Sequence, residues 1–176
     1  IGDSMPALIC LGATVVLTGA EGSRSLPLED FYLDCMKKDL RPGEFVAAVR
    51  VPRARPGQIV RCYKIAKRFD QDISAVCGAF AVELAAGRVR TARVCFGGMA
   101  ATPRRANACE RALTGTELAP EAIGKAISAL ATDFQPITDF RASQAYRMRV
   151  AANLLQRFAI EVSQPAAGAS VWSHAG

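Results

Sequence analysis

Apolar residues along this chain first alternate with a period of two and later recur every three or four positions. The alternating, β-prone runs cover residues 59–68, 73–84 and 89–96. Ala85-Ala86-Gly87 joins the second run to the third, and this connection suits a hairpin but is too short for a parallel crossover. Both alternating sets of the run 73–84 are apolar, as in a central strand that is covered on both faces. We therefore expect a three-stranded antiparallel sheet.

Three helices are expected after these strands. Thr102-Pro103 offers a cap followed by a proline at the first helical position, and Gly115 ends that segment. A second helix begins at Ala119-Pro120, and the longest begins near Ser143. Strands followed by helices predict an α+β fold, in which the helices cover one face of the sheet.

The longest helix is expected to bury an apolar stripe with a spacing of four residues. The stripe consists of Tyr146, Val150, Leu154 and Phe158. Arg147, Arg149 and Arg157 fall outside this stripe.

The first third of the chain reads as a short helix, a hairpin and a further strand. The expected elements are a helix over 5–11, a strand over 13–18, its partner over 23–26, a helix over 28–35 and a strand over 44–51. Residues 52–57 are rich in arginine and proline and are typical of a linker. The chain is thus expected to divide into 1–52, 53–162 and a tail over 163–176.

Charge and hydropathy narrow the class of protein. The 22 Lys and Arg residues exceed the 16 Asp and Glu residues, giving a net charge of +6 that favours acidic partners. A soluble surface rich in arginine explains the same excess. The longest apolar stretches fall short of the roughly 20 residues that a membrane helix needs, and we expect a cytoplasmic protein that contacts neither membrane nor nucleic acid.

Six cysteines occur without any C-x-x-C pair. Most stand in apolar surroundings, as expected of small buried residues in a reducing compartment, so we expect no metal site in this chain. His174 is the only histidine and lies in the tail, which argues against serine–histidine or cysteine–histidine catalysis. No catalytic residue is expected, and any redox chemistry must come from a cofactor.

Four segments are candidates for binding. Gly2-Asp3-Ser4 precedes a helix start, where free amide groups favour a polar ligand, and we expect the other half of such a site upstream of Ile1. Residues 61–72 are rich in charged side chains. These either face a cofactor or are solvated at the tip of a hairpin. Gly97-Gly98 before two arginines suits either an anion or a tight turn, and residues 139–147 cap the last helix.

Seven blocks in order resemble the FAD-binding part of the xanthine dehydrogenases, in the molybdenum hydroxylase family. They are 2–8, 26–32, 41–44, 63–64, 72–74, 97–100 and 141–143. The resemblance is greatest to the bacterial small subunit, which carries iron–sulfur and FAD domains, and it covers nearly the whole chain. It implies that residues 1–52 end the FAD-binding subdomain and that the sheet and helices form the C-terminal flavoprotein subdomain.

The resemblance also implies three cofactor-binding residues. Asp3 would contact the ribose or pyrophosphate side of FAD, Val46 would lie against the isoalloxazine ring, and Lys64 would approach the flavin from the second segment. The flavin-side loop that influences access of NAD would comprise Lys67, Arg68, Phe69, Asp70, Gln71 and Asp72. In this family the loop commonly carries an acidic residue near the flavin ring. In this chain that position is occupied by Gln71, or the acid is displaced to Asp70.

The family further implies cofactors and partners that this chain does not contain. The 2Fe–2S domains and the pyrophosphate loop would lie upstream of Ile1, and the molybdenum cofactor would belong to a large subunit of a hetero-oligomer. Electrons from hypoxanthine or xanthine would pass through FAD to NAD, and this fragment alone would be inactive. Two alternatives remain: the FAD subunit of a molybdenum hydroxylase that oxidises aldehydes or carbon monoxide, and a non-catalytic assembly module.

Overall fold

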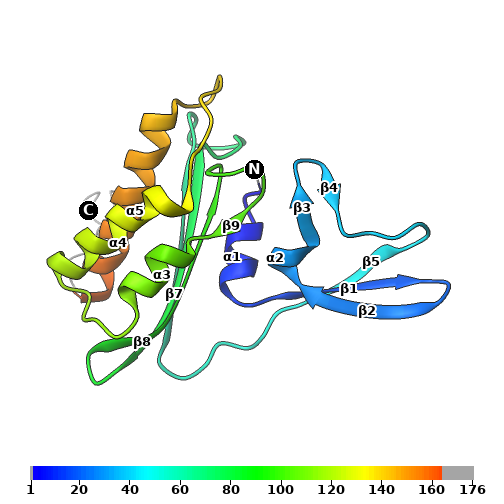
Figure 1. Ribbon diagram of the computed structural model, residues 1–176, viewed down its shortest axis with the longest axis horizontal. Helices are drawn as coiled ribbons and strands as arrows, with labels where there is room; N and C mark the ends of the chain where they lie inside the picture. The colour runs from blue at the N-terminus through cyan, green and yellow to red at the C-terminus, as the bar shows by residue number, and fades with distance from the viewer. Residues whose placement is uncertain (1, 164–176) are drawn as a thin grey trace.

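Two antiparallel sheets lie side by side with one short helix between them (Figure 1). The computed structural model describes residues 2–163. The helix is α1, Met5–Cys10, which ends before Gly12 at a positive φ of 74°. The first sheet has the order β2-β1-β5 and comprises β1 (Thr14–Gly19), β2 (Gly22–Pro27) and β5 (Phe45–Arg50). The expected helix, hairpin and strand of the first third are confirmed.

The helix expected over residues 28–35 is wrong beyond its first turn. Helix α2 covers only Leu28–Phe31, and the small hairpin of β3 (Tyr32–Asp34) and β4 (Lys37–Lys38) follows it. Met36 adopts a positive φ of 59° at the turn, and the amide of Asp39 donates to the carbonyl of Phe31 to close the hairpin. A helix of one turn suffices to bury Leu28 and Phe31 beneath the first sheet.

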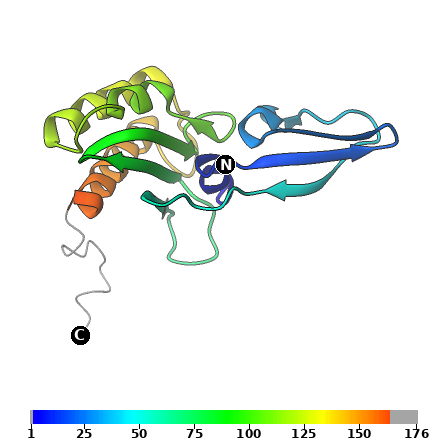
Figure 2. The same cartoon turned by 90° about the horizontal axis from the view of Figure 1, so that it is seen from below.

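The second sheet and its helices have the α+β arrangement expected from the sequence. Strands β6 (Gln58–Ile65), β7 (Val76–Ala85) and β8 (Arg88–Gly97) are antiparallel, and β9 (Arg104–Arg105) adds a short fourth strand. Helices α3 (Asn107–Leu113), α4 (Pro120–Asp133) and α5 (Gln144–Ser163) cover one face, while α1 lies on the other (Figure 2).

Helix α3 begins later than the Thr102-Pro103 signal predicts. Arg104 and Arg105 pair with Phe96 and Cys95 instead and form β9. The start of α3 is capped from a distance, because the two carboxylate oxygens of Asp133 accept hydrogen bonds from the amides of Ala108 and Cys109 at 2.8 and 2.9 Å.

Strand β7 is buried on both faces, as expected, and the two faces differ in side-chain size. Phe80 and Val82 point to the helices, where they pack with Phe96 and Phe158. The opposite face carries the small residues Cys77, Ala79 and Ala81, against which α1 seats Ile9 and Cys10. Small side chains let a helix approach a sheet closely, so this face joins the two sheets through one continuous core.

The stripe expected on α5 is confirmed at Leu154 and Phe158, which are buried, but it is wrong at Tyr146. Tyr146 is 48% exposed, whereas Arg147 is 1% exposed and points inward together with Ala151, Leu155 and Phe158. The guanidinium of Arg147 donates to the carbonyls of Ala75 and Gly98 and to Asp139. A charged side chain can be buried in this core because fixed hydrogen-bond acceptors replace the water molecules that would otherwise hydrate it.

Gly98 occupies a position where only glycine fits. Its φ is 82°, and an added Cβ would lie 2.3 Å from the carbonyl oxygen of Ala75 and 3.0 Å from the Arg147 side chain. Gly115 has a φ of 83° with open space around it. We expect Gly98→Ala to lower the free energy of unfolding by about 2 kcal/mol more than Gly115→Ala, measured by denaturant titration. Equal losses in the two variants would show that the clash with Ala75 costs nothing.

The helices of the described residues do not meet the requirements for crossing a membrane, since none combines sufficient length with sufficient apolarity.

Candidate functional site

Asp3 and Lys64, which are 61 positions apart in sequence, meet where the loop before α1 reaches the edge strand β6. The Nζ of Lys64 donates to Asp3 Oδ2 at 2.5 Å and also to the carbonyl of Asp72. The other oxygen of Asp3 accepts from the buried Ser74 hydroxyl at 2.6 Å and from the Ser74 amide at 3.3 Å. We call Asp3, Lys64, Asp72 and Ser74 the Asp3–Lys64 cluster.

Glycines at the end of β8 allow the loop before α1 to lie against the second sheet. A Cβ on Gly97 would come within 3.2 Å of the Gly2 carbonyl and of the Pro6 ring. This geometry favours the tight-turn interpretation of Gly97-Gly98 over the anion-binding one. Ser4 makes no side-chain cap to α1, and Asp3 turns its carboxylate toward β6 and Ser74 instead of toward the helix amides.

Asp3 and Lys64 of the cluster are both charged at neutral pH. Burial alone raises the pKa of Asp3, but the hydrogen bonds from Lys64 and Ser74 outweigh it and leave the pKa below its ordinary 3.8. The hydrogen bond to Asp3 raises the pKa of Lys64 above 10.5. The side chains of Lys64 and Asp3 remain 43% and 37% exposed, so both can contact a ligand as well as each other.

The loop between β6 and β7 is tied to this cluster at one end and to the start of α5 at the other. The Asp72 carboxylate accepts from the amides of Arg68 and Ile73 at 3.1 and 2.9 Å. Lys67 Nζ donates to the Phe140 carbonyl at 2.6 Å, and Gln71 adopts a positive φ of 49°. The charged segment 61–72 is thus the end of β6, which carries Lys64, followed by a turn that hydrogen bonds hold in place.

Val46 lies apart from the Asp3–Lys64 cluster. It stands on β5 in the first sheet, opposite Leu17, and is 43% exposed. Other large apolar side chains are exposed on β5 and on the neighbouring segment of β3, β4 and the turn after it: Leu33, Met36, Leu40, Phe45 and Val49. In the part of the chain that the structure describes, the apolar side chains around Val46 are therefore exposed.

A charged network that the sequence analysis did not identify links the two sheets. Arg93 donates to the carbonyl of Ile9 at 2.6 Å and to Glu29 at 3.0 Å. Arg105 donates to the same carboxylate at 3.3 Å and to Glu110 at 2.5 Å. Glu29, on α2, is thereby held by arginines from β8 and β9. No short sequence motif marks these residues, because only the fold brings them together.

We expect Glu29→Gln to lower the free energy of unfolding by about 1 kcal/mol, because two charge-assisted hydrogen bonds weaken in a partly buried site. Glu121→Gln is the matched control, since among residues 2–163 Glu121 pairs only with Lys125 on an exposed turn of α4. The control variant is expected to lose less stability in the same denaturant titration. A larger loss for Glu121→Gln than for Glu29→Gln would contradict the bridging role of Glu29.

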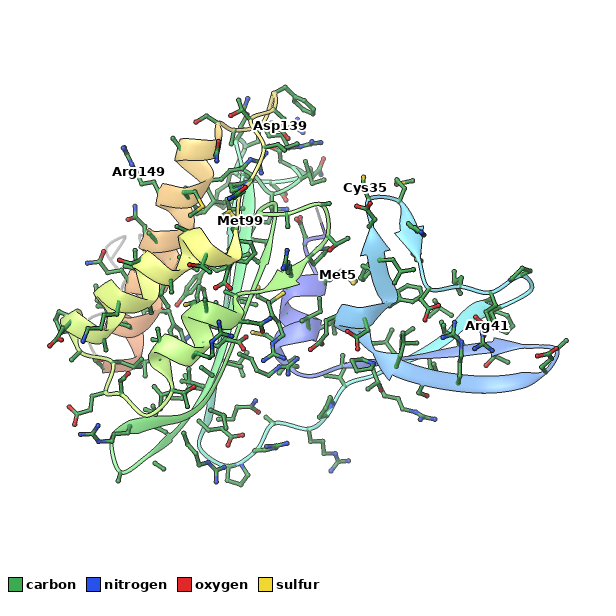
Figure 3. The ribbon with its side chains drawn as sticks, viewed as in Figure 1. Met5, Cys35, Arg41, Met99, Asp139 and Arg149 are labelled. Atoms are coloured by element: carbon green, nitrogen blue, oxygen red, sulfur yellow. The ribbon has the colours of Figure 1, made fainter. Side chains whose placement is uncertain are left out.

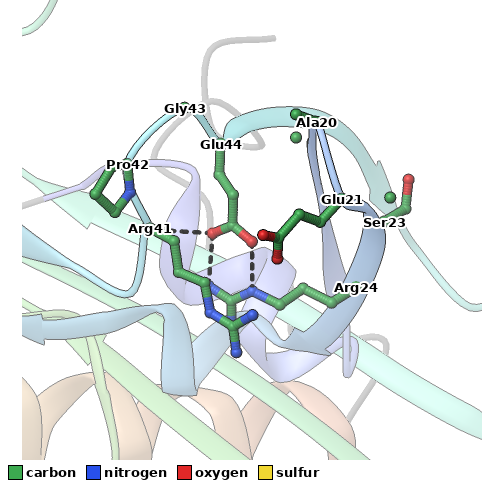
Figure 4. Close-up of a pocket in the computed structure, with 10 residues that line it drawn as sticks. Ala20, Glu21, Ser23, Arg24, Arg41, Pro42, Gly43 and Glu44 are labelled. Carbon is green, nitrogen blue, oxygen red and sulfur yellow. Dashed lines mark hydrogen bonds and ion pairs between the residues drawn. The ribbon is translucent and has the colours of Figure 1, made fainter.

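A polar depression of about 430 Å³ lies far along the first sheet, at the β1–β2 turn and the turn before β5 (Figure 4). Arg24 crosses its floor and donates to Glu44 at 2.8 Å and to Asp39 at 2.9 Å. The hydrogen bond from Arg24 lowers the pKa of Glu44 to about 2. These charges satisfy one another, so the arrangement serves to fix the two turns.

Comparison with known proteins gives two family matches in sequence order. Residues 1–54 match the FAD binding domain in molybdopterin dehydrogenase, and residues 61–162 match the CO dehydrogenase flavoprotein C-terminal domain. Asp3 and Val46 fall in the first match, and Lys64 falls in the second.

Individual relatives agree with these matches. The carbon monoxide dehydrogenase medium chain of Afipia carboxidovorans is 32% identical over 157 residues, which cover 89% of this chain and 54% of the relative. The xanthine dehydrogenase of Emericella nidulans is 29% identical over 162 residues, covering 90% of this chain and 12% of the relative. The chain thus spans about half of the medium chain and a smaller part of the xanthine dehydrogenase.

A solved structure has the same fold. The carbon monoxide dehydrogenase from Hydrogenophaga pseudoflava, in a form that lacks the Mo-pyranopterin moiety, superposes with a TM-score of 0.83 at 27% identity. The superposition covers 89% of this chain and 54% of that chain.

Proposed function

This chain belongs to the flavoprotein family of the molybdopterin dehydrogenases, and on that premise we propose that it supplies one side of an FAD site in a multi-subunit molybdenum hydroxylase. Its partners would be a large subunit with the molybdenum cofactor and a small subunit with the iron–sulfur clusters. The chain's role is to hold the flavin environment through which electrons leave the enzyme.

The observation that carries this proposal is the Asp3–Lys64 cluster. It joins a residue of the segment that matches the FAD-binding family to a residue of the segment that matches the flavoprotein C-terminal family. Lys64 has three N–H donors, of which Asp3 and Asp72 accept two in the described residues. A partly exposed ammonium with donor capacity to spare fits a cofactor rich in carbonyl, hydroxyl and phosphate oxygens.

Each of the candidate residues has a physical role in this proposal. FAD, when bound, supplies the reversible uptake of electrons. Lys64 donates to an oxygen at the flavin edge and keeps a positive charge there, while Asp3 fixes Lys64 and accepts from a hydroxyl of the ribose or ribityl side. Val46 offers an apolar surface that excludes water from a ring face. The turn from Lys67 to Asp72 borders the same site.

Within the family, the relatives favour a medium chain of the carbon monoxide dehydrogenase type over the xanthine dehydrogenase that the sequence blocks suggested. The medium chain matches at 32% identity and the xanthine dehydrogenase at 29%, over similar shares of this chain. Xanthine dehydrogenase, with NAD as acceptor, remains the second candidate because the seven sequence blocks support it.

The experiment that tests the function uses the complete flavoprotein subunit and its partner subunits. We expect the purified subunit to carry FAD, and a colourless complete subunit that does not take up added FAD would contradict the proposal and favour an assembly module. Supplying carbon monoxide, an aldehyde or xanthine to the assembled enzyme and recording flavin bleaching distinguishes the candidate substrates.

A further inference from the structure

Two thiols lie next to each other beside the Asp3–Lys64 cluster. Cys62 on β6 and Cys77 on β7 have their Sγ atoms 4.0 Å apart. Cys62 stands opposite Ala79, and Cys77 stands opposite Lys64, so the two cysteines are diagonal neighbours across the strand pair. Residues at diagonal positions project from the same face of a sheet, and the Sγ–Sγ distance of 4.0 Å shows that these two side chains are directed toward each other.

The two thiols differ in exposure and acidity. Cys62 is exposed, and the hydrogen bond from Cys77 lowers the pKa of Cys62 to about 7. Cys77 is buried, and its hydrogen bond to Cys62 together with burial raises the pKa of Cys77. Cys62 is therefore the partner that ionises and meets solutes, while Cys77 stays protonated behind it.

The remaining cysteines lack this combination. Cys10, Cys95 and Cys109 are buried, and burial raises the pKa of each thiol. Cys35 is exposed but stands alone at the turn between β3 and β4, well away from β7 (Figure 3).

We propose that Cys62 and Cys77 form a reversible dithiol–disulfide pair that hydrogen peroxide oxidises. The Cys62 thiolate attacks one peroxide oxygen, the O–O bond breaks, and hydroxide leaves to give a sulfenic acid on Cys62. The Cys77 sulfur then attacks the Cys62 sulfur, forming the S–S bond and releasing water. In total, two thiols lose two electrons and two protons, and one peroxide becomes two waters.

Oxidation of this pair acts on the neighbouring loop. In the reduced protein the single hydrogen of the Cys77 thiol has two acceptors within reach, the Cys62 sulfur and the Asp3 carbonyl oxygen at 3.4 Å, and the disulfide has no such hydrogen. The sulfurs must also approach from 4.0 Å to about 2.05 Å, which requires a shift between β6 and β7 beside the Asp3 loop. Any effect on FAD rests on the proposed function, whereas formation of the disulfide does not.

The test treats the complete protein with hydrogen peroxide, blocks free thiols with N-ethylmaleimide in denaturant, and digests with trypsin. Cys62 then lies in the peptide 62–64, and Cys77 lies in the peptide 69–88, with no other cysteine in either. We expect these two peptides joined by a disulfide, with dithiothreitol before blocking restoring both thiols. Cys35→Ser is expected to form the same product, whereas Cys62→Ser and Cys77→Ala are expected to form none.

Three results would overturn the proposal. One is peroxide oxidation of Cys62 to sulfinic acid while Cys77 remains a free thiol. Another is that Cys62 and Cys77 both remain free thiols after peroxide treatment that oxidises Cys35. A third is equal formation of the linked peptides in protein that was unfolded before treatment, because the product would then not depend on the folded geometry.

Discussion

Arg147→Met is expected to lower the free energy of unfolding by about 3 kcal/mol, because it leaves buried acceptors without their donor. The guanidinium joins the carbonyls of Ala75 and Gly98, at the ends of two strands, to Asp139 before α5. Methionine fills much of the same space but donates to none of these oxygens. The measurement is a denaturant titration that compares the variant with the parent protein.

The control for this variant comes from the same helix. Arg149 lies two positions further along α5 and is exposed, and Figure 3 shows its side chain directed away from Asp139. Arg149→Met is expected to change stability by less than about 0.5 kcal/mol. Similar stabilities for the two variants would show that the buried guanidinium adds nothing to the join between α5 and the sheet.

Lys64→Glu is expected to weaken FAD binding by the complete flavoprotein subunit by about tenfold or more. The substitution places a second carboxylate beside Asp3, so the two acids repel each other and the flavin edge loses its cationic donor. The readout is the FAD dissociation constant, obtained by titrating the FAD-free subunit and following flavin fluorescence.

Lys125→Glu is the charge-matched control for this variant. Lys125 lies on an exposed turn of α4 and, like Lys64, forms a short ion pair with a carboxylate, that of Glu121. FAD affinity is expected to be unchanged in this control. Equal FAD affinities for Lys64→Glu and the parent protein, with both proteins folded, would remove Lys64 from the flavin site.

Hydrophobic periodicity predicted the strands and helices well but not how charged groups pair across the fold. The run 73–84 predicted a doubly covered central strand, and β7 is one. Arg147 was placed outside the expected apolar stripe, yet it is buried because the carbonyls of Ala75 and Gly98, from distant parts of the chain, accept its hydrogen bonds. Such acceptors exist only after β7, β8 and α5 have packed.

The predicted ends of helices and strands were wrong where pairing with a distant strand competed with a local sequence signal. Thr102-Pro103 has the residues of a helix start, but Arg104 and Arg105 gain strand partners in β8 before α3 begins. Residues 32–35 have no strong strand pattern, and β3 forms because the chain turns back at Met36. Local propensity is a weak guide at such positions.

That Asp3, Val46 and Lys64 bind FAD stays a prediction. Residue types and the family resemblance pointed to Asp3 and Lys64, and the structure brings these two together across 61 positions. Their contact depends on Ser74 and on the glycines that end β8, which the sequence analysis assigned to other roles or to none. The thiol pair of Cys62 and Cys77 escaped notice because its two members are 15 positions apart and become neighbours only across β6 and β7.

Chemical footprinting of lysines in the complete flavoprotein subunit tests most directly whether the Asp3–Lys64 cluster borders FAD. Brief acetylation with and without bound FAD, followed by mass spectrometry, compares Lys64 with the exposed Lys125 in the same sample. The account predicts that FAD slows acetylation of Lys64 and leaves that of Lys125 unchanged. Equal rates at Lys64 in the FAD-bound and FAD-free protein would contradict it.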